Sequence, residues 1–61
     1  MSDNNKITTN SIWKSKTYSN VFYIVVSINK INDIVEYRDL RGGEIYMSYT
    51  DKFLGWLQHV Q

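Results

Sequence analysis

The chain has 61 residues, which is enough for one small domain, and it carries seven Lys and Arg against six Asp and Glu. It has no Cys and a single His, so disulfide bonds and a Cys/His zinc site are excluded as sources of stability. The net charge of +1 removes the strong electrostatic argument for a nucleic-acid or membrane partner, and 15% aromatic residues point to a core built from large rings.

The first ten residues are polar and rich in Asn and Thr, so residues 1–10 are predicted to be a flexible tail. A single domain is predicted for residues 11–61. It begins with a short strand over residues 12–16, which alternate weakly between apolar and polar side chains. Turn-forming residues follow at residues 17–20.

The strongest predicted strand covers residues 20–29, which are mostly β-branched or aromatic. One of its faces carries Phe22, Ile24, Val26 and Ile28. Its other face carries Tyr23, Val25 and Ser27. Because this second face is only half polar, we expect it to be partly covered. Asn and Asp at residues 30–33 then predict a connection to the next strand.

Residues 34–40 predict a half-buried strand with Val35 and Tyr37 on one face and Glu36 and Arg38 on the other. Gly42 and Gly43 follow, and Gly-Gly tolerates positive φ at both central positions of a tight hairpin turn. The returning strand is predicted at residues 44–49. We expect its inward side chains to be Ile45, Met47 and Tyr49, and its outward ones to be Glu44, Tyr46 and Ser48.

The last segment leaves two alternatives open. Thr50 is a plausible helix cap and Asp51 is an acid in the first turn, so a short helical turn is expected from residue 50. Gly55 argues against a long helix. We favour a short closing strand within residues 56–60 over one longer helix laid across the barrel mouth.

This order of elements predicts an all-β fold, a small SH3-like barrel of four to five antiparallel strands with a short helical turn near the C-terminus. The "VEYRDL" strand at residues 35–40, the glycine turn, Ile45-Tyr46-Met47 and Lys52-Phe53 resemble a family of small uncharacterised bacterial and phage proteins with this barrel. The family has a Pro after the aromatic strand, where this chain has residues 48–50 (SYT). The resemblance implies a fold and no catalytic role.

Composition also bears on origin and location. The chain lacks Ala and Pro and is rich in Ile, Asn, Lys and Tyr, whose codons are AT-rich, which favours a phage gene. The absence of Cys fits a reducing compartment, and the longest apolar run, residues 21–26, is far too short to span a bilayer. Without a secretory leader at the N-terminus, a cytoplasmic protein with no membrane contact is predicted.

Catalysis has little support in this sequence. His59 is close to the C-terminus, and no spacing fixes an orienting acid beside it. Glu36 and Glu44 are expected to pair across strands with Arg38 or Arg41 rather than to act as an acid and base. No Cys/His cluster and no calcium-type Asp run occurs. We therefore predict a protein that is not an enzyme and has no cofactor and no metal.

Binding of a partner is the predicted function, and two partner classes compete. Small barrels bind single-stranded nucleic acid by stacking bases on exposed rings beside cations such as Lys14 and Lys16. Binding to a host protein or host defence component is favoured, because Tyr, Trp and Arg dominate protein interfaces. Self-association as a homodimer is a third alternative. The predicted partner-binding residues are Trp13, Tyr18, Tyr23, Arg38, Arg41 and Tyr46.

Overall fold

The computed structural model describes residues 7–60, which form five strands and one short helix. The strands are β1 (Ile12–Ser15), β2 (Phe22–Asn29), β3 (Ile34–Asp39), β4 (Ile45–Tyr49) and β5 (Leu57–His59), and the helix is α1 (Thr50–Trp56). Each strand lies within about two residues of its predicted bounds. The favoured alternative for the last segment, a helical turn followed by a short closing strand, is confirmed.

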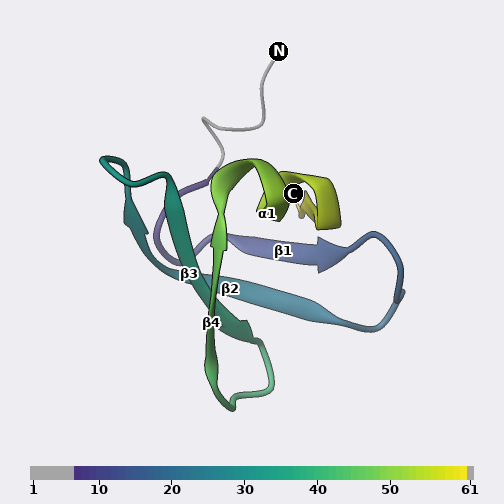
Figure 1. Cartoon of the computed structure of the whole chain (residues 1–61). Helices are drawn as coiled ribbons and strands as arrows, with labels where there is room; N and C mark the ends of the chain where they lie inside the picture. The colour runs from purple at the N-terminus through teal and green to yellow at the C-terminus, as the bar shows by residue number, and fades with distance from the viewer. Residues whose placement is uncertain (1–6, 61) are drawn as a thin grey trace.

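All neighbouring strands are antiparallel, and their order across the sheet is β4-β3-β2-β1-β5. The first four strands form a meander, and α1 then carries the chain back so that β5 pairs with β1. Figure 1 shows β2 passing behind β3 and β4, with α1 above β1. This is the predicted SH3-like barrel.

The core is centred on the ring of Trp13, which is fully buried. Its centroid lies 4.9 Å from that of Phe53 and 5.2 Å from that of His59, both in edge-to-face geometry. The indole Nε1 donates a hydrogen bond of 2.9 Å to Ser11 Oγ, so the one polar atom of the ring is satisfied. The prediction that Trp13 faces outward is wrong, because its strand turns this side chain toward α1 and β5.

The core receives the half-polar face of β2 rather than its fully apolar face. Tyr23 and Val25 point inward, and Val25 is fully buried. A β-bulge at Val26 then shifts the register between Val25 and Ser27, so that Ile28 packs against the core instead of Ser27. Ser27 Oγ instead donates a hydrogen bond to the carboxylate of Glu36 on β3. Glu36 therefore has a serine partner in place of the predicted arginine.

The pairing of β3 with β4 reverses the predicted faces of β4. Val35 and Tyr37 are buried as predicted, and they stand opposite Ser48 and Tyr46. Directly opposed residues share a face of the sheet, so Tyr46 and Ser48 lie on the inner side. The Ser48 hydroxyl lies 2.9 Å from Tyr37 Oη, within hydrogen-bond distance. The outer side of β4 carries the residues predicted to be inward, Ile45, Met47 and Tyr49.

The loop between β3 and β4 is longer than the tight turn that Gly-Gly suggested. Gly42 and Gly43 do adopt positive φ, of 102° and 109°, in a connection that covers residues 40–44. Between β2 and β3, Asp33 takes a φ of 56° and Asn29 Oδ1 accepts hydrogen bonds from two backbone N–H groups of the turn. Both connections thus use the residue types expected of turns.

The predicted tail is wrong for residues 7–10. Ile7 is buried in the core, and the Asn10 N–H donates a hydrogen bond of 2.8 Å to the Val25 carbonyl. This short segment therefore belongs to the barrel. The remainder of the predicted tail, residues 1–6, lies outside the described residues.

The helix α1 begins without the predicted side-chain cap. Its N-cap residue is Tyr49, and the Thr50 hydroxyl donates instead to the Asp33 carbonyl at 3.1 Å. Asp51 lies in the first turn as predicted, and Phe53 is the buried residue of the helix. The chain then enters β5 directly at Leu57. Within residues 7–60, no helix has the length and apolar character needed to cross a membrane.

We expect Trp13→Ala to lower the free energy of unfolding by about 3 to 5 kcal/mol, because it opens a cavity between Phe53 and His59. For a domain this small, such a loss removes most of the stability. Trp56→Ala is the matched control, since that ring is largely exposed, and it should cost less than about 1 kcal/mol. Urea denaturation followed by circular dichroism measures both, and equal losses would contradict the assigned core.

Replacement of glycine by alanine should have opposite effects on stability at Gly43 and at Gly55. A Cβ at Gly43 or at Gly55 would meet no atom within 4 Å, so only the backbone conformation matters. Gly43→Ala should destabilise the fold by about 1 to 3 kcal/mol because of its positive φ. Gly55→Ala should stabilise it by about 0.5 to 1 kcal/mol because Gly55 is helical. Thermal unfolding of the two variants shows whether each is more or less stable than the wild type. A change in the same direction for both would refute the explanation.

Candidate functional site

An open depression of about 280 Å³ lies between the β1–β2 loop and the junction of α1 with β5. It is lined mostly by aromatic and hydroxyl side chains, which we call the tyrosine groove: Ser15, Thr17, Tyr18, Tyr23, Tyr37, Trp56 and Leu57. Ser15 and Leu57 form one pair of the β1–β5 ladder, so the floor of the groove is part of the sheet. The groove is thus built on the strand pairing that closes the barrel.

The first bank of the groove is the β1–β2 loop, which Ser15 shapes. The Ser15 side chain is buried, and its Oγ accepts hydrogen bonds from the backbone N–H groups of Thr17 at 3.1 Å and Tyr18 at 3.0 Å. The Ser15 N–H donates to the Val21 carbonyl at 2.9 Å and closes the loop at its base. These bonds fix the backbone from which the exposed ring of Tyr18 projects.

The second bank is the end of α1, where Trp56 is exposed. Lys16 connects the two banks, because its backbone N–H donates to the Trp56 carbonyl at 2.9 Å and its Nζ donates to the Leu54 carbonyl at 2.9 Å. The ammonium group thereby satisfies a carbonyl near the C-terminus of the helix. The distance between Tyr18 and Trp56 is therefore held by hydrogen bonds on both main chain and side chain.

Three tyrosine rings extend the groove across the sheet toward β4. The centroid of Tyr23 lies 5.4 Å from that of Tyr37 and 6.3 Å from that of Tyr46, and both pairs are edge-to-face. The Tyr37 and Tyr46 centroids are 5.8 Å apart. Tyr37 also contacts Phe53 at 5.1 Å, so the cluster rests on the core. Such ring pairs stabilise one another beyond simple burial and hold a fixed aromatic surface.

Charges stand at the end of the cluster where Asp39 pairs in register with Tyr23. The Arg41 Nε lies 3.3 Å from Asp39 Oδ1, and the Arg41 backbone N–H donates to the same oxygen at 2.8 Å. These hydrogen bonds from Arg41 hold the pKa of Asp39 below 3.8 and raise the pKa of the guanidinium. Arg41 therefore has Asp39 as its partner, not the predicted Glu36 or Glu44.

The pKa of the Tyr23 hydroxyl is raised above 10.0, first by its burial and then by Tyr37, Asp39 and Tyr46, while Arg41 lowers it. Tyr23 is therefore neutral at physiological pH and acts as a hydrogen-bond donor or acceptor. A raised pKa in the folded state makes a contribution to stability that is present below pH 10 and is lost as the pH rises through the folded value.

The predicted site residues separate into three groups. Tyr18 and Tyr23 do line the groove, Tyr46 lies beside it in contact with Tyr23, and Arg41 is close enough to influence Tyr23. Trp13 is in the core instead. Arg38 stands opposite Ile24 and Ile45 on the outer face of the sheet, away from the tyrosines. Whether the groove residues bind a partner stays a prediction.

Sequence reasoning missed five of the seven groove residues: Ser15, Thr17, Tyr37, Trp56 and Leu57. Tyr37 was predicted to be a core residue, and its edge nevertheless lines the groove. Trp56 carried no signal that could have been used, because residues three apart share a face of a helix, so its spacing from Phe53 favours burial. The ring is exposed all the same, and Trp56 is the last residue of α1, directly before β5.

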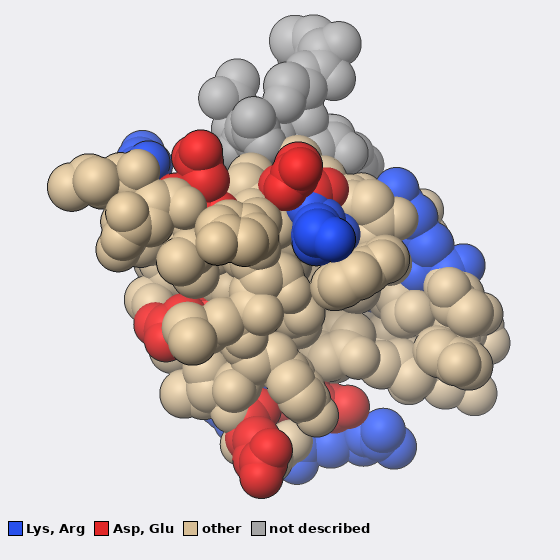
Figure 2. Space-filling model, in the orientation of Figure 1, with Lys and Arg blue, Asp and Glu red and all other residues tan. Residues whose placement is uncertain are grey.

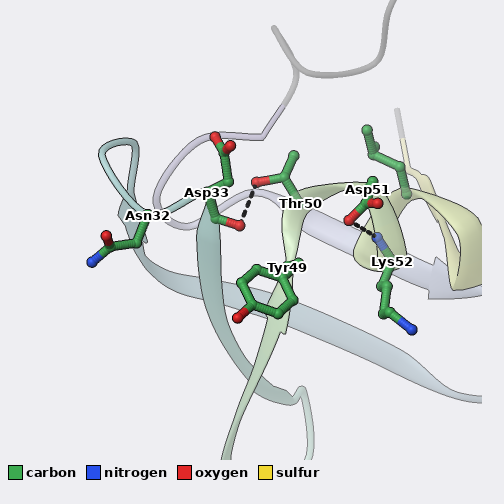
Figure 3. A pocket seen from close by; sticks show the side chains of 7 residues that line it. Asn32, Asp33, Tyr49, Thr50, Asp51 and Lys52 are labelled. Atoms are coloured by element: carbon green, nitrogen blue, oxygen red, sulfur yellow. Dashed lines mark hydrogen bonds between the residues drawn. The ribbon is translucent and has the colours of Figure 1, made fainter.

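A wider depression of about 610 Å³ lies at the opposite end of the barrel, between the β2–β3 turn and the start of α1. Figure 3 shows that its polar groups are used locally: Thr50 bonds to the Asp33 carbonyl and Asp51 accepts from the Lys52 N–H, while the Lys52 side chain points away. In residues 7–60, no group of three His, Cys, Asp or Glu side chains could hold a metal ion. This depression offers no arrangement of reacting groups.

His59 lies against Trp13 at the other side of the core, and its ring is partly buried. Within the described part of the chain its Nδ1 has no hydrogen-bond partner, so no carboxylate there orients the imidazole. An imidazole packed edge-to-face on an indole serves as a core side chain. The structure thus gives His59 a packing role, and the absence of catalysis stays a prediction.

We expect the Asp39 carboxyl to titrate below 3.8 and to return toward that value in Arg41→Gln, because the hydrogen bonds from the guanidinium are lost. The lowered pKa makes a contribution to stability that is present above the ordinary pKa and is lost as the pH falls through the folded value. NMR titration of the side-chain carboxyl carbons measures this. Arg38→Gln is the control, and an equal shift in that variant would refute the pairing.

Comparisons with protein-family models, with curated proteins and with solved structures each gave no match to this chain. The resemblance to small bacterial and phage proteins with an SH3-like barrel therefore stays a prediction from the sequence. The groove has to be interpreted from its own chemistry.

Proposed function

We propose that this chain is a non-enzymatic binding module that holds another protein at the tyrosine groove. The observation that carries the proposal is an open depression whose two banks end in exposed rings. Tyr18 is 66% exposed and Trp56 is 56% exposed, while hydrogen bonds fix the backbone of both banks. Tyr and Trp are the residues that contribute most at protein interfaces, and rigid rings lose little entropy when a partner covers them.

The size of the groove favours a side chain of a protein over a cofactor. At about 280 Å³ and open on one side, it is close to the lower limit for small-molecule sites. One large apolar side chain of a partner would fill it between Tyr18 and Trp56. Hydroxyl groups of Tyr23 and Thr17 line the same space and can bond to the backbone of the partner segment.

The cations near the groove argue against the nucleic-acid alternative. Lys16 and Arg41 are the ones closest to the rings, and both have partners, the Leu54 carbonyl and Asp39. Lys14 and Arg38 alternate with inward residues of their strands and so point to the outer face. Binding to a phosphate backbone needs a row of cations beside the stacking rings.

The amino-acid composition, which favours a phage gene, also bears on where the partner comes from. A phage-encoded protein in the host cytoplasm is surrounded mainly by host proteins. We therefore propose a host protein, such as a component of host defence, as the partner that this module binds and modulates.

Capture from an extract of the natural host, with and without nuclease, followed by mass spectrometry, tests the proposal. We expect a host protein that is retained after nuclease treatment. With that protein purified, Trp56→Ser and Tyr18→Ser should each weaken its affinity at least tenfold, about 1.4 kcal/mol, because each removes one bank of the groove.

Ile31→Ser is the control for loss of an exposed apolar group, since Ile31 lies in the β2–β3 turn, is 94% exposed and is outside the groove. The Ile31→Ser variant should bind the captured protein with the same affinity as the wild type. Recovery of nucleic acid alone, lost steeply as salt rises, would refute a protein partner. If the partner binds Trp56→Ser and Tyr18→Ser as tightly as the wild type, the assignment of the site is refuted.

A further inference from the structure

Among residues 7–60, the strand β4 forms one edge of the sheet and pairs with β3 alone. Its sequence, Ile45-Tyr46-Met47-Ser48-Tyr49, contains no charge, no Gly and no Pro. Edge strands of natural proteins are usually protected by a Lys, a Pro, a bulge or a covering segment, because they otherwise pair with further strands. Figure 2 shows the uncharged surface over β4, with charged groups gathered toward its two ends.

The direction of the free backbone groups follows from one hydrogen bond. The Thr50 N–H donates to the Asp33 carbonyl at 2.7 Å, so the opposed residues Ile34 and Tyr49 are a pair that exchanges no backbone hydrogen bonds. The two kinds of pair alternate along an antiparallel ladder. The N–H and C=O groups of Ile45 and Met47 therefore point away from β3. The N–H of Tyr49 does so too, while its C=O accepts the first hydrogen bond of α1, whose N-cap is Tyr49.

These same three residues carry the exposed side chains of the outer face. Ile45 is 54% exposed, Met47 66% and Tyr49 57%. A shallow apolar depression beside them is lined by Ile34, Met47, Ser48 and Tyr49. A strand added along β4 would therefore meet hydrogen-bonding groups at the edge and apolar side chains on the outer face at the same positions.

We propose that the added strand is β4 of a second copy of this chain, antiparallel to the first, with the two-fold axis at Met47. In this register Met47 faces Met47 of the second copy, and Ile45 faces Tyr49 of the second copy. The Met47 pair then exchanges both backbone hydrogen bonds, and in each Ile45–Tyr49 pair the Tyr49 N–H donates to the Ile45 carbonyl. The outer faces join into one continuous apolar strip.

A second copy fits this edge because the register sets no like charges against one another. The residues that flank the strand are Glu44 and Thr50, and the two-fold axis brings Glu44 of one copy opposite Thr50 of the other. An interface confined to two five-residue strands is smaller than the roughly 1,200 to 2,000 Å² of stable complexes, so the dimer is weak and reversible.

Sedimentation equilibrium over a wide range of protein concentrations tests the association. The weight-average mass of the wild type should rise from 7.2 kDa toward twice that value. Met47→Lys sets two cations against each other on the axis and should weaken dimerisation at least tenfold, while Ile31→Lys, which adds the same charge in the β2–β3 turn, should not. A wild type that stays monomeric, or equal association of the two variants, would overturn the proposal.

The register has its own test, because the chain contains no Cys. Met47→Cys places two thiols across the axis at about 5.5 Å between Cα atoms, within the range of a disulfide, so mild oxidation should give a covalent dimer. Ile45→Cys and Tyr49→Cys should not cross-link alone and should cross-link when mixed. Equal cross-linking of all three single variants would overturn the register.

Discussion

Burial of the Trp13 ring is the interaction on which the barrel depends. The ring contacts Phe53 of α1 and His59 of β5, and its Nε1 is bonded to Ser11. Three separate parts of the chain therefore meet at one side chain. Since β5 has only three residues, its ladder with β1 is too short to hold that edge without this packing. The tyrosine groove depends on the same pairing of β1 with β5, because Ser15 and Leu57 of that pairing form its floor.

The order of elements could be predicted from the sequence because each strand and turn carries a local signal, such as the alternation around Val35 and Tyr37. Which face of a strand points into the core could not always be predicted. On β4, one face carries Ile45, Met47 and Tyr49 and the other Tyr46 and Ser48, so hydropathy favours Met47 as the inward residue. The register with β3 decides otherwise, because the inner position opposite Val35 goes to Ser48, whose hydroxyl meets that of Tyr37. This pairing is a long-range fact that no local window contains.

Only part of the candidate site could be predicted, for a related reason. A bulge such as the one at Val26 changes the face of later residues without changing composition, so period-two reasoning fails beyond it. Tyr23 precedes the bulge and lines the groove, and Tyr46 lies beside it, across from Tyr37. Trp13 does not reach the groove, because on a 61-residue chain a large ring is needed to fill the core. The other tryptophan, Trp56, lies at the surface.

The pairing of β1 with β5 also governs how the protein is made. Trp13 and His59 come from opposite ends of the described chain, so this contact forms only after nearly all of the described residues have been synthesised. Until His59 leaves the ribosome, the edge of β1 is open and Trp13 lacks its cover. An open strand edge and an uncovered indole make such a nascent chain prone to aggregation.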